Sequence, residues 1–149
     1  MSARVRRCEP ADRGSAVIEF IVIGVLVLVP LAYISMCVMR VQAATVASSL
    51  AVREAGRAFV TADTVPDARA RAATAARLAL FDQGFELPAR ALSIRCSSGG
   101  CLQPESSVHV ELAWAVELPW LPRFLGEERT EIPITAQRTM PVDTYRGDQ

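Results

Sequence analysis

The stretch from Phe20 to Met39 constrains this chain more than any other feature, because it holds twenty residues without one charged side chain. A helix of that length spans about 30 Å, the thickness of a bilayer's hydrocarbon core. A buried helix of a soluble protein shows a polar stripe, and this stretch has none. We therefore predict a transmembrane helix over residues 20–39. Pro30 lies within it, and membrane helices tolerate proline where a helix in water would break.

The charges flanking this run predict its orientation. Residues 1–15 carry four arginines against two acidic residues, whereas the other flank has only Arg40 before Arg53. Positive charge is retained on the cytoplasmic side of a span. We expect a single-pass protein of the cell membrane, with the N-terminus in the cytoplasm and residues 40–149 extracytoplasmic. The reverse orientation is the alternative.

Composition excludes several function classes. The 16 basic residues balance the 16 acidic ones, so no nucleic-acid partner is expected. A hydrophobic content of 51% excludes a disordered chain. Ser107, His109 and Glu111 share one face of a predicted strand, but neighbours on that face lie about 6.5–7 Å apart, beyond hydrogen-bond reach. With a single histidine in the chain, we predict no catalytic residue, no metal and no cofactor.

Two cysteines of the extracytoplasmic part predict a disulfide. Cys96 and Cys101 flank a Ser-Ser-Gly-Gly segment that is able to turn sharply. Compartments outside the cytoplasm permit disulfide formation. Two free thiols are the alternative, and a zinc site that adds His109 is a third reading that lacks an evident fourth ligand.

Residue periodicity predicts an α+β protein with a long N-terminal transmembrane helix, a second helix and a small antiparallel sheet. We divide it into a leader over residues 1–14, a long helix over 15–62 and an extracytoplasmic α+β domain over 63–149. The second helix should start after a capping box at Thr64 and run from Val65 to Gln83, with Gly84 at its C-terminal cap. Its expected inward residues are Ala73, Ala76, Leu80 and Phe81.

The last part of the chain changes to a two-residue period, which predicts strands over residues 91–96, 107–118 and 130–137. Pro133 assigns the third strand to an edge of the sheet. We expect a loose tail from Met140 to Gln149. The expected inward residues are Leu92, Ile94, Val108, Val110, Leu112, Trp114, Val116, Leu118, Ile132, Ile134 and Ala136.

Alanines recur at four-residue spacing in the outer half of the long helix. Such a row lets another helix approach closely. Alanine is abundant throughout this chain, so chance is the alternative. The residues of the row are Ala43, Ala47, Ala51 and Ala55.

Glu19 is unusual, because it places a carboxylate where the apolar run begins. A charge buried in lipid is costly, although less so near the interface. If the chain were cut after Gly14, the new ammonium group of Ser15 would lie about 6 Å along the helix from Glu19. In an assembly, Glu19 would neutralise the Ser15 ammonium of a neighbouring subunit.

The segment Arg13-Gly14-Ser15-Ala16-Val17-Ile18-Glu19-Phe20 resembles the processing motif of type IV prepilins, in which glycine precedes glutamate and an aromatic residue. Together with the Pro30-interrupted run and the helix from Val41 to Val60, it resembles the TadE-like pseudopilins of tight-adherence (Tad/Flp) pilus systems. The resemblance implies a pilin-like layout for this α+β chain, and cleavage between Gly14 and Ser15 by a prepilin peptidase. It also implies that Glu19 and Phe20 act in processing and assembly. The implied partners are that peptidase, pilus platform proteins and other pilins or pseudopilins.

Two other functions remain open at this point. The chain is alternatively an uncleaved, single-pass envelope or binding protein with a small disulfide-containing ectodomain, or a secreted protein cut after Ala43.

A cluster of apolar residues late in the chain is either part of the core or a docking patch for another subunit. It consists of Trp114, Trp120, Leu121, Phe124 and Leu125.

Overall fold

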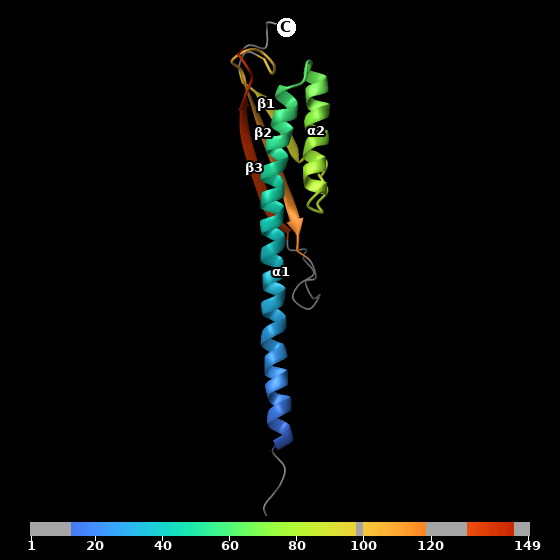
Figure 1. Ribbon diagram of the computed structural model, residues 1–149, viewed down its shortest axis with the longest axis vertical. Coiled ribbons are helices and arrows are strands. Elements are labelled where there is room, and N and C mark those ends of the chain that lie inside the picture. The colour runs from blue at the N-terminus through green and yellow to red at the C-terminus, as the bar shows by residue number, and fades with distance from the viewer. Residues whose placement is uncertain (1–12, 98–99, 119–130, 145–149) are drawn as a thin grey trace, which may run out of the picture. The chain divides into compact units, whose positions relative to one another are not determined.

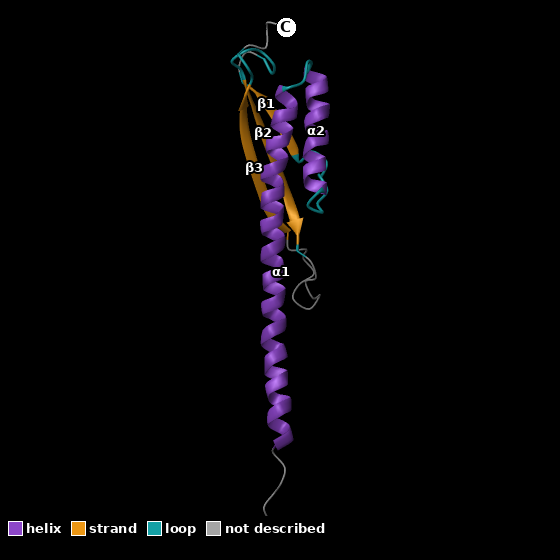
Figure 2. Ribbon diagram, in the orientation of Figure 1, coloured by secondary structure: helices purple, strands orange, loops and turns teal. Residues whose placement is uncertain are grey.

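A computed structural model describes residues 13–97, 100–118 and 131–144. The elements follow one another as α1 (Arg13–Val60), α2 (Val65–Phe81), β1 (Leu92–Cys96), β2 (Ser107–Glu117) and β3 (Glu131–Pro141) (Figures 1 and 2). The predicted α+β class is confirmed. Contacts within the chain define two units, Met1–Met36 and Cys37–Gln149.

The first unit contains the beginning of α1. The helix starts at Arg13, two residues earlier than predicted, and its assignment is unbroken through Pro30. Side chains from Ala16 to Met36 are exposed, apart from the half-buried Gly24 and Tyr33. The helix is long and apolar enough to cross a membrane. The expectation of a long apolar N-terminal helix is confirmed.

The second unit has its core between helices and sheet. From Ala44 onward, one side of α1 is fully buried, down to Phe59 near its end at Val60. This core also contains four alanines and Leu80 of α2, together with apolar side chains of β2. The two largest fully buried side chains, Phe59 and Leu80, come from the helices, and the alanines around them let the helices pack closely against the apolar side chains of β2.

Local signals explain both ends of α2. The Thr64 hydroxyl oxygen accepts a hydrogen bond from the Asp67 N–H at 3.4 Å, and Pro66 occupies the first turn. At the other end Gly84 has φ 76°, the left-handed conformation that glycine adopts without strain. The Phe85 N–H donates to the Leu80 carbonyl and the Gly84 N–H to the Phe81 carbonyl, which completes a Schellman motif. The helix itself ends two residues before the predicted Gln83.

The prediction that Phe81 faces inward is wrong. Its side chain is 70% exposed, while the adjacent Leu80 is fully buried. Successive residues of a helix point about 100° apart, so the face that buries Leu80 turns Phe81 outward. The buried residues of α2 are Ala68, Ala72, Ala76, Ala79 and Leu80.

The three strands form one antiparallel sheet in the order β1-β2-β3. Leu112 of β2 lies opposite Leu92 of β1 and Ala136 of β3. The alternation predicted for β2 is confirmed, because Val108, Val110, Leu112 and Val116 are buried and Trp114 is half-buried. The polar partners on the other face include His109 and Glu111.

Both helices lie over the same face of the sheet. A Cβ built on Gly56 of α1 would come within 2.8 Å of Cγ of Met140 and 3.6 Å of Val110. Helix α2 lines a shallow groove together with Leu92 and Ile94 of β1. Leu92 and Ile94 face the same way as Val110, because they pair with Leu112 and Val110 of β2.

Strand β3 forms an edge, as Pro133 predicts, but it is longer than predicted and continues to Pro141. The prediction of a loose tail from Met140 is therefore wrong at its start, since Val142 is 97% buried and its N–H donates to the Ser106 carbonyl at 2.8 Å.

The same hydrogen bond shows which N–H groups of β3 face β2. Because alternate residues of a strand point their N–H groups to the same side, the N–H groups of even-numbered residues in β3 face β2. Pro133 and Pro141 both occupy positions whose N–H would point away from the sheet.

Several predictions fall outside the described residues. They concern most of the leader, the end of the tail and most of the late apolar cluster: residues 1–12, residues 145–149, Trp120, Leu121, Phe124 and Leu125.

Candidate processing site and domain contacts

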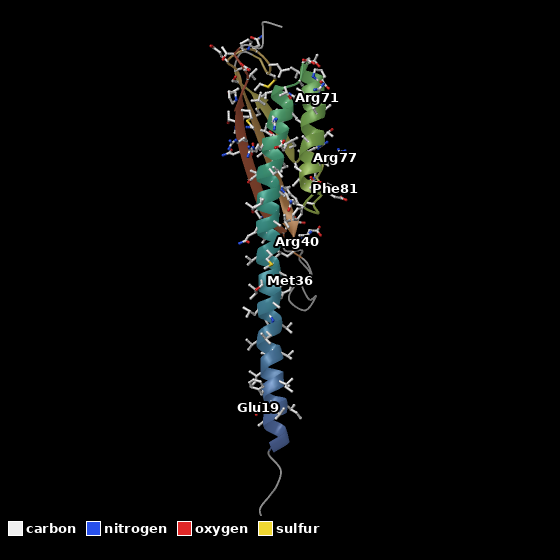
Figure 3. The ribbon with its side chains drawn as sticks, viewed as in Figure 1. Glu19, Met36, Arg40, Arg71, Arg77 and Phe81 are labelled. Atoms are coloured by element: carbon white, nitrogen blue, oxygen red, sulfur yellow. A yellow bond between two sulfur atoms is a disulfide. The ribbon has the colours of Figure 1, made fainter. Side chains whose placement is uncertain are left out.

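The residues of the prepilin-like motif lie in the first two turns of α1. Gly14 and Ser15 follow Arg13 at the start of the helix, and Glu19 comes one turn after Ser15. Glu19 and Phe20 are exposed, Phe20 to 78% (Figure 3 labels Glu19). The helical backbone separates Ser15 and Glu19 by about 6 Å along the axis. The Glu19 carboxylate therefore lies one helical turn after the bond between Gly14 and Ser15.

Glu19 makes no ion pair with any residue in the part of the chain that the structure describes. Its neighbours along the helix, Ile18 and Phe20, are apolar and exposed. In a bilayer this carboxylate would pay a desolvation cost that only a cation or the interface relieves.

The alanine row of α1 is used inside the protein. Ala47, Ala51 and Ala55 are fully buried and Ala43 is half-buried. They belong to the same core as the alanines of α2. The row therefore contributes to packing within the domain, and its three inner members are not accessible to a second protein.

A chain of side-chain contacts joins α1, the segment after α2 and β2. The Trp114 indole N–H donates to the Ser48 hydroxyl at 2.9 Å, and Ser48 in turn donates to the Ala44 carbonyl at 2.7 Å. The rings of Phe85 and Trp114 meet edge to face with centroids 5.4 Å apart. The Arg40 guanidinium carbon lies 5.0 Å from the centre of the Phe85 ring, a cation–π distance.

The sequence predicted that Trp114 faces inward, but it predicted none of these side-chain pairs. Ser48 lies 66 residues from Trp114, and no sequence period connects them. The sequence signal for this contact was Ser48 itself, a polar residue beside the alanine row. If that side of the helix is buried, its hydroxyl needs a hydrogen-bond partner.

The predicted disulfide is present. Cys96 ends β1 and joins Cys101 across a Cα separation of 4.9 Å. The two alternatives for this pair, free thiols and a zinc site, do not describe the structure. Cys37 is a free, half-buried thiol in α1. Within residues 13–97, 100–118 and 131–144, no group of histidine, cysteine or acidic side chains is placed to hold a metal ion.

Two of the polar side chains on the outer face of the sheet, His109 and Glu111, have partners on the neighbouring strands. A ring nitrogen of His109 lies 3.0 Å from the Thr139 hydroxyl. The Glu111 carboxylate pairs with Arg95 at 3.6 Å. These contacts run between neighbouring strands, in keeping with the pairing of His109 with Thr139 and of Glu111 with Ser93.

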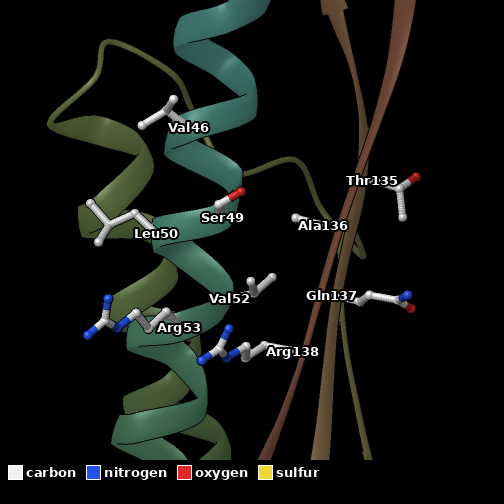
Figure 4. Close-up of a pocket in the computed structure, with 9 residues that line it drawn as sticks. All are labelled: Val46, Ser49, Leu50, Val52, Arg53, Thr135, Ala136, Gln137 and Arg138. Atoms are coloured by element: carbon white, nitrogen blue, oxygen red, sulfur yellow. The ribbon is translucent and has the colours of Figure 1, made fainter.

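A groove of about 430 Å³ lies between α1 and β3 (Figure 4). Val46, Leu50 and Val52 supply an apolar wall, and Arg53 and Arg138 contribute two guanidinium groups. Chemically it suits a partner that combines apolar and acidic side chains.

Comparison of the chain with protein-family models, with curated protein sequences and with solved structures gives no match.

Proposed function

We propose that this chain is a membrane-anchored, TadE-like pseudopilin that supports assembly of a Tad/Flp-type pilus. In this proposal the prepilin peptidase cuts between Gly14 and Ser15, α1 spans the membrane over residues 20–39, and the N-terminal leader is cytoplasmic. The domain that follows contacts pilus platform proteins and other pilins or pseudopilins. Its role is structural, without catalysis or a cofactor.

One observation carries the proposal. Gly14, Glu19 and Phe20 stand at the head of a helix whose next residues are uncharged as far as Met39. A plain anchor gains nothing from a carboxylate there, because desolvation opposes it. Cleavage after Gly14 explains the acid, because it creates an ammonium group at Ser15 that Glu19 of a neighbouring subunit neutralises in an assembly. The layout of a long helix, a second helix and a small sheet supports the same assignment.

The N-terminal residue of the membrane-purified protein tests the proposal. The full chain is co-expressed with a prepilin peptidase, and the product is analysed by N-terminal sequencing and intact mass. We expect a start at Ser15. Gly14→Val should block the cut, because it places a bulky side chain at the scissile bond. Gly24→Val is the matched control, since Gly24 lies in the same helix with open space around it, and this variant should be cut normally.

Two other starts would contradict the proposal and identify its replacement. A start at Met1 or Ser2, with the peptidase active on a known substrate, indicates an uncleaved envelope or binding protein. A soluble product that starts at Ala44 indicates cleavage by signal peptidase.

A further inference from the structure

The last turn of α2 exposes an apolar pair. Leu78 is 59% exposed and Phe81 is 70% exposed. They lie three residues apart and therefore share one side of the helix. Earlier positions on that side are polar, as the exposed ion pair between Asp67 and Arg71 shows. The outward side of α2 thus changes from charged to apolar toward its C-terminal end.

That end of α2 lies beside the residue that closes the apolar run of α1. Phe85, which completes the cap of α2, is in cation–π contact with Arg40. Arg40 directly follows Met39, the last residue of the uncharged stretch. Figure 3 shows Phe81 at the end of α2 nearest Arg40, and Arg71 toward the opposite end. If α1 spans a membrane, Arg40 lies at headgroup depth, because an arginine reaches from a helix end to the interface.

We propose that Leu78 and Phe81 insert into the surface of the same bilayer that α1 spans, so that the domain contacts the membrane at a second point. Aromatic and aliphatic side chains favour the boundary between headgroups and acyl chains. Arg77, on the preceding turn from Phe81, is exposed and reaches lipid phosphates. Exposed Asp82 and Glu86 lie at the same end, so apolar insertion rather than net charge drives the contact, and it should persist at high salt.

This inference rests on the proposed membrane anchoring of α1, and the experiment separates the two. Single cysteines carry the environment-sensitive fluorophore NBD in the full chain, with Cys8→Ser and Cys37→Ser and with the Cys96–Cys101 disulfide left intact. The probe positions are Phe81→Cys, the control Arg71→Cys about 15 Å earlier on the same helix, and Leu28→Cys within the apolar run. The protein is reconstituted into phosphatidylcholine vesicles, with nitroxide-labelled lipid or aqueous iodide as the quencher.

We expect the probe at position 81 to show blue-shifted emission, quenching by nitroxide placed high on the acyl chain, and a several-fold lower iodide quenching constant than at position 71. Adding Leu78→Gln should reduce the lipid quenching at position 81. Equal iodide access at positions 71 and 81 overturns the proposal. Protection from iodide without lipid quenching also overturns it, because a protein surface then covers Phe81. If the probe at position 28 is not quenched by lipid, the span itself fails and this proposal falls with it.

Discussion

Ser48 shows how one hydroxyl can join two elements. It is fully buried on the alanine-rich side of α1, where it accepts a hydrogen bond from the Trp114 indole and donates one to the Ala44 carbonyl. An alanine at this position would fit the volume, but it would leave the indole N–H without its acceptor in a partly dry site.

We therefore predict that Ser48→Ala lowers the free energy of unfolding by about 1–2 kcal/mol. Ser49→Ala is the matched control, because Ser49 makes the same backbone bond to the carbonyl four residues earlier but is exposed. It should change stability by less than about 0.5 kcal/mol. Denaturant unfolding in detergent, followed by tryptophan fluorescence, measures both, and equal losses would contradict the assigned role of Ser48.

Gly56 permits the close approach of α1 to β3. Its added Cβ would come within 2.8 Å of Cγ of Met140, which is not the free end of that side chain. Overpacking of this kind costs about 1–3 kcal/mol, more than the roughly 1 kcal/mol that alanine gains over glycine in a helix.

The expected result for Gly56→Ala is a net loss of about 1 kcal/mol in unfolding free energy. In a Met140→Ala background the obstructing atoms are absent, so the same change should stabilise by up to about 1 kcal/mol. A double-mutant cycle measures this reversal of sign. A stabilising Gly56→Ala in the parent would show that the two elements are not in close contact.

At the scale of elements, the cap of α2 depends on the backbone of one residue. Gly84 has φ 76° with open space where a Cβ would lie, so conformation rather than collision opposes substitution. Gly84→Ala should cost about 1 kcal/mol, because an L-residue is strained in the left-handed region. Gly84→Asn should cost clearly less, since asparagine tolerates that region. Thermal unfolding compares the two, and an equal cost would locate the effect elsewhere.

The elements were predicted from sequence where one local pattern decided them. The alternation in β2 and the capping residues Thr64 and Gly84 belong to that class. Phe81 was placed wrongly because α2 is rich in alanine, and small residues on several sides leave the phase of the buried face undefined. The end of β3 was missed because its ordering comes from distant partners, such as Gly56 for Met140 and Ser106 for Val142.

At the scale of the whole molecule, the proposed processing site was visible in sequence and the domain contacts were not. Gly14, Glu19 and Phe20 are close in sequence, so the motif can be recognised from their spacing alone. The chain of contacts from Arg40 through Phe85 and Trp114 joins three separate segments, and only the folded structure brings them together.

The proposed role in pilus assembly also concerns the whole molecule, and a Glu19→Ala variant tests it. Glu19→Ala removes the carboxylate that we propose pairs with a neighbouring Ser15 ammonium. We expect loss of surface pili in a complemented deletion strain, counted by electron microscopy, while the protein stays in the membrane. Glu54→Ala is the control, because Glu54 is also an acid of α1 but lies in the domain. Pilus numbers equal to the parent's in Glu19→Ala would overturn the proposed pairing.

The two prolines of β3 affect how neighbouring copies of the chain can associate. Pro133 and Pro141 remove two outward donors, eight residues apart along the same exposed border. A strand of a neighbouring copy that paired with β3 would lack a hydrogen-bond donor near each end of β3, which disfavours cross-β growth. Neighbouring copies can therefore come close together without joining their sheets into a fibre through β3. Ordered association is left to surfaces other than the β3 edge.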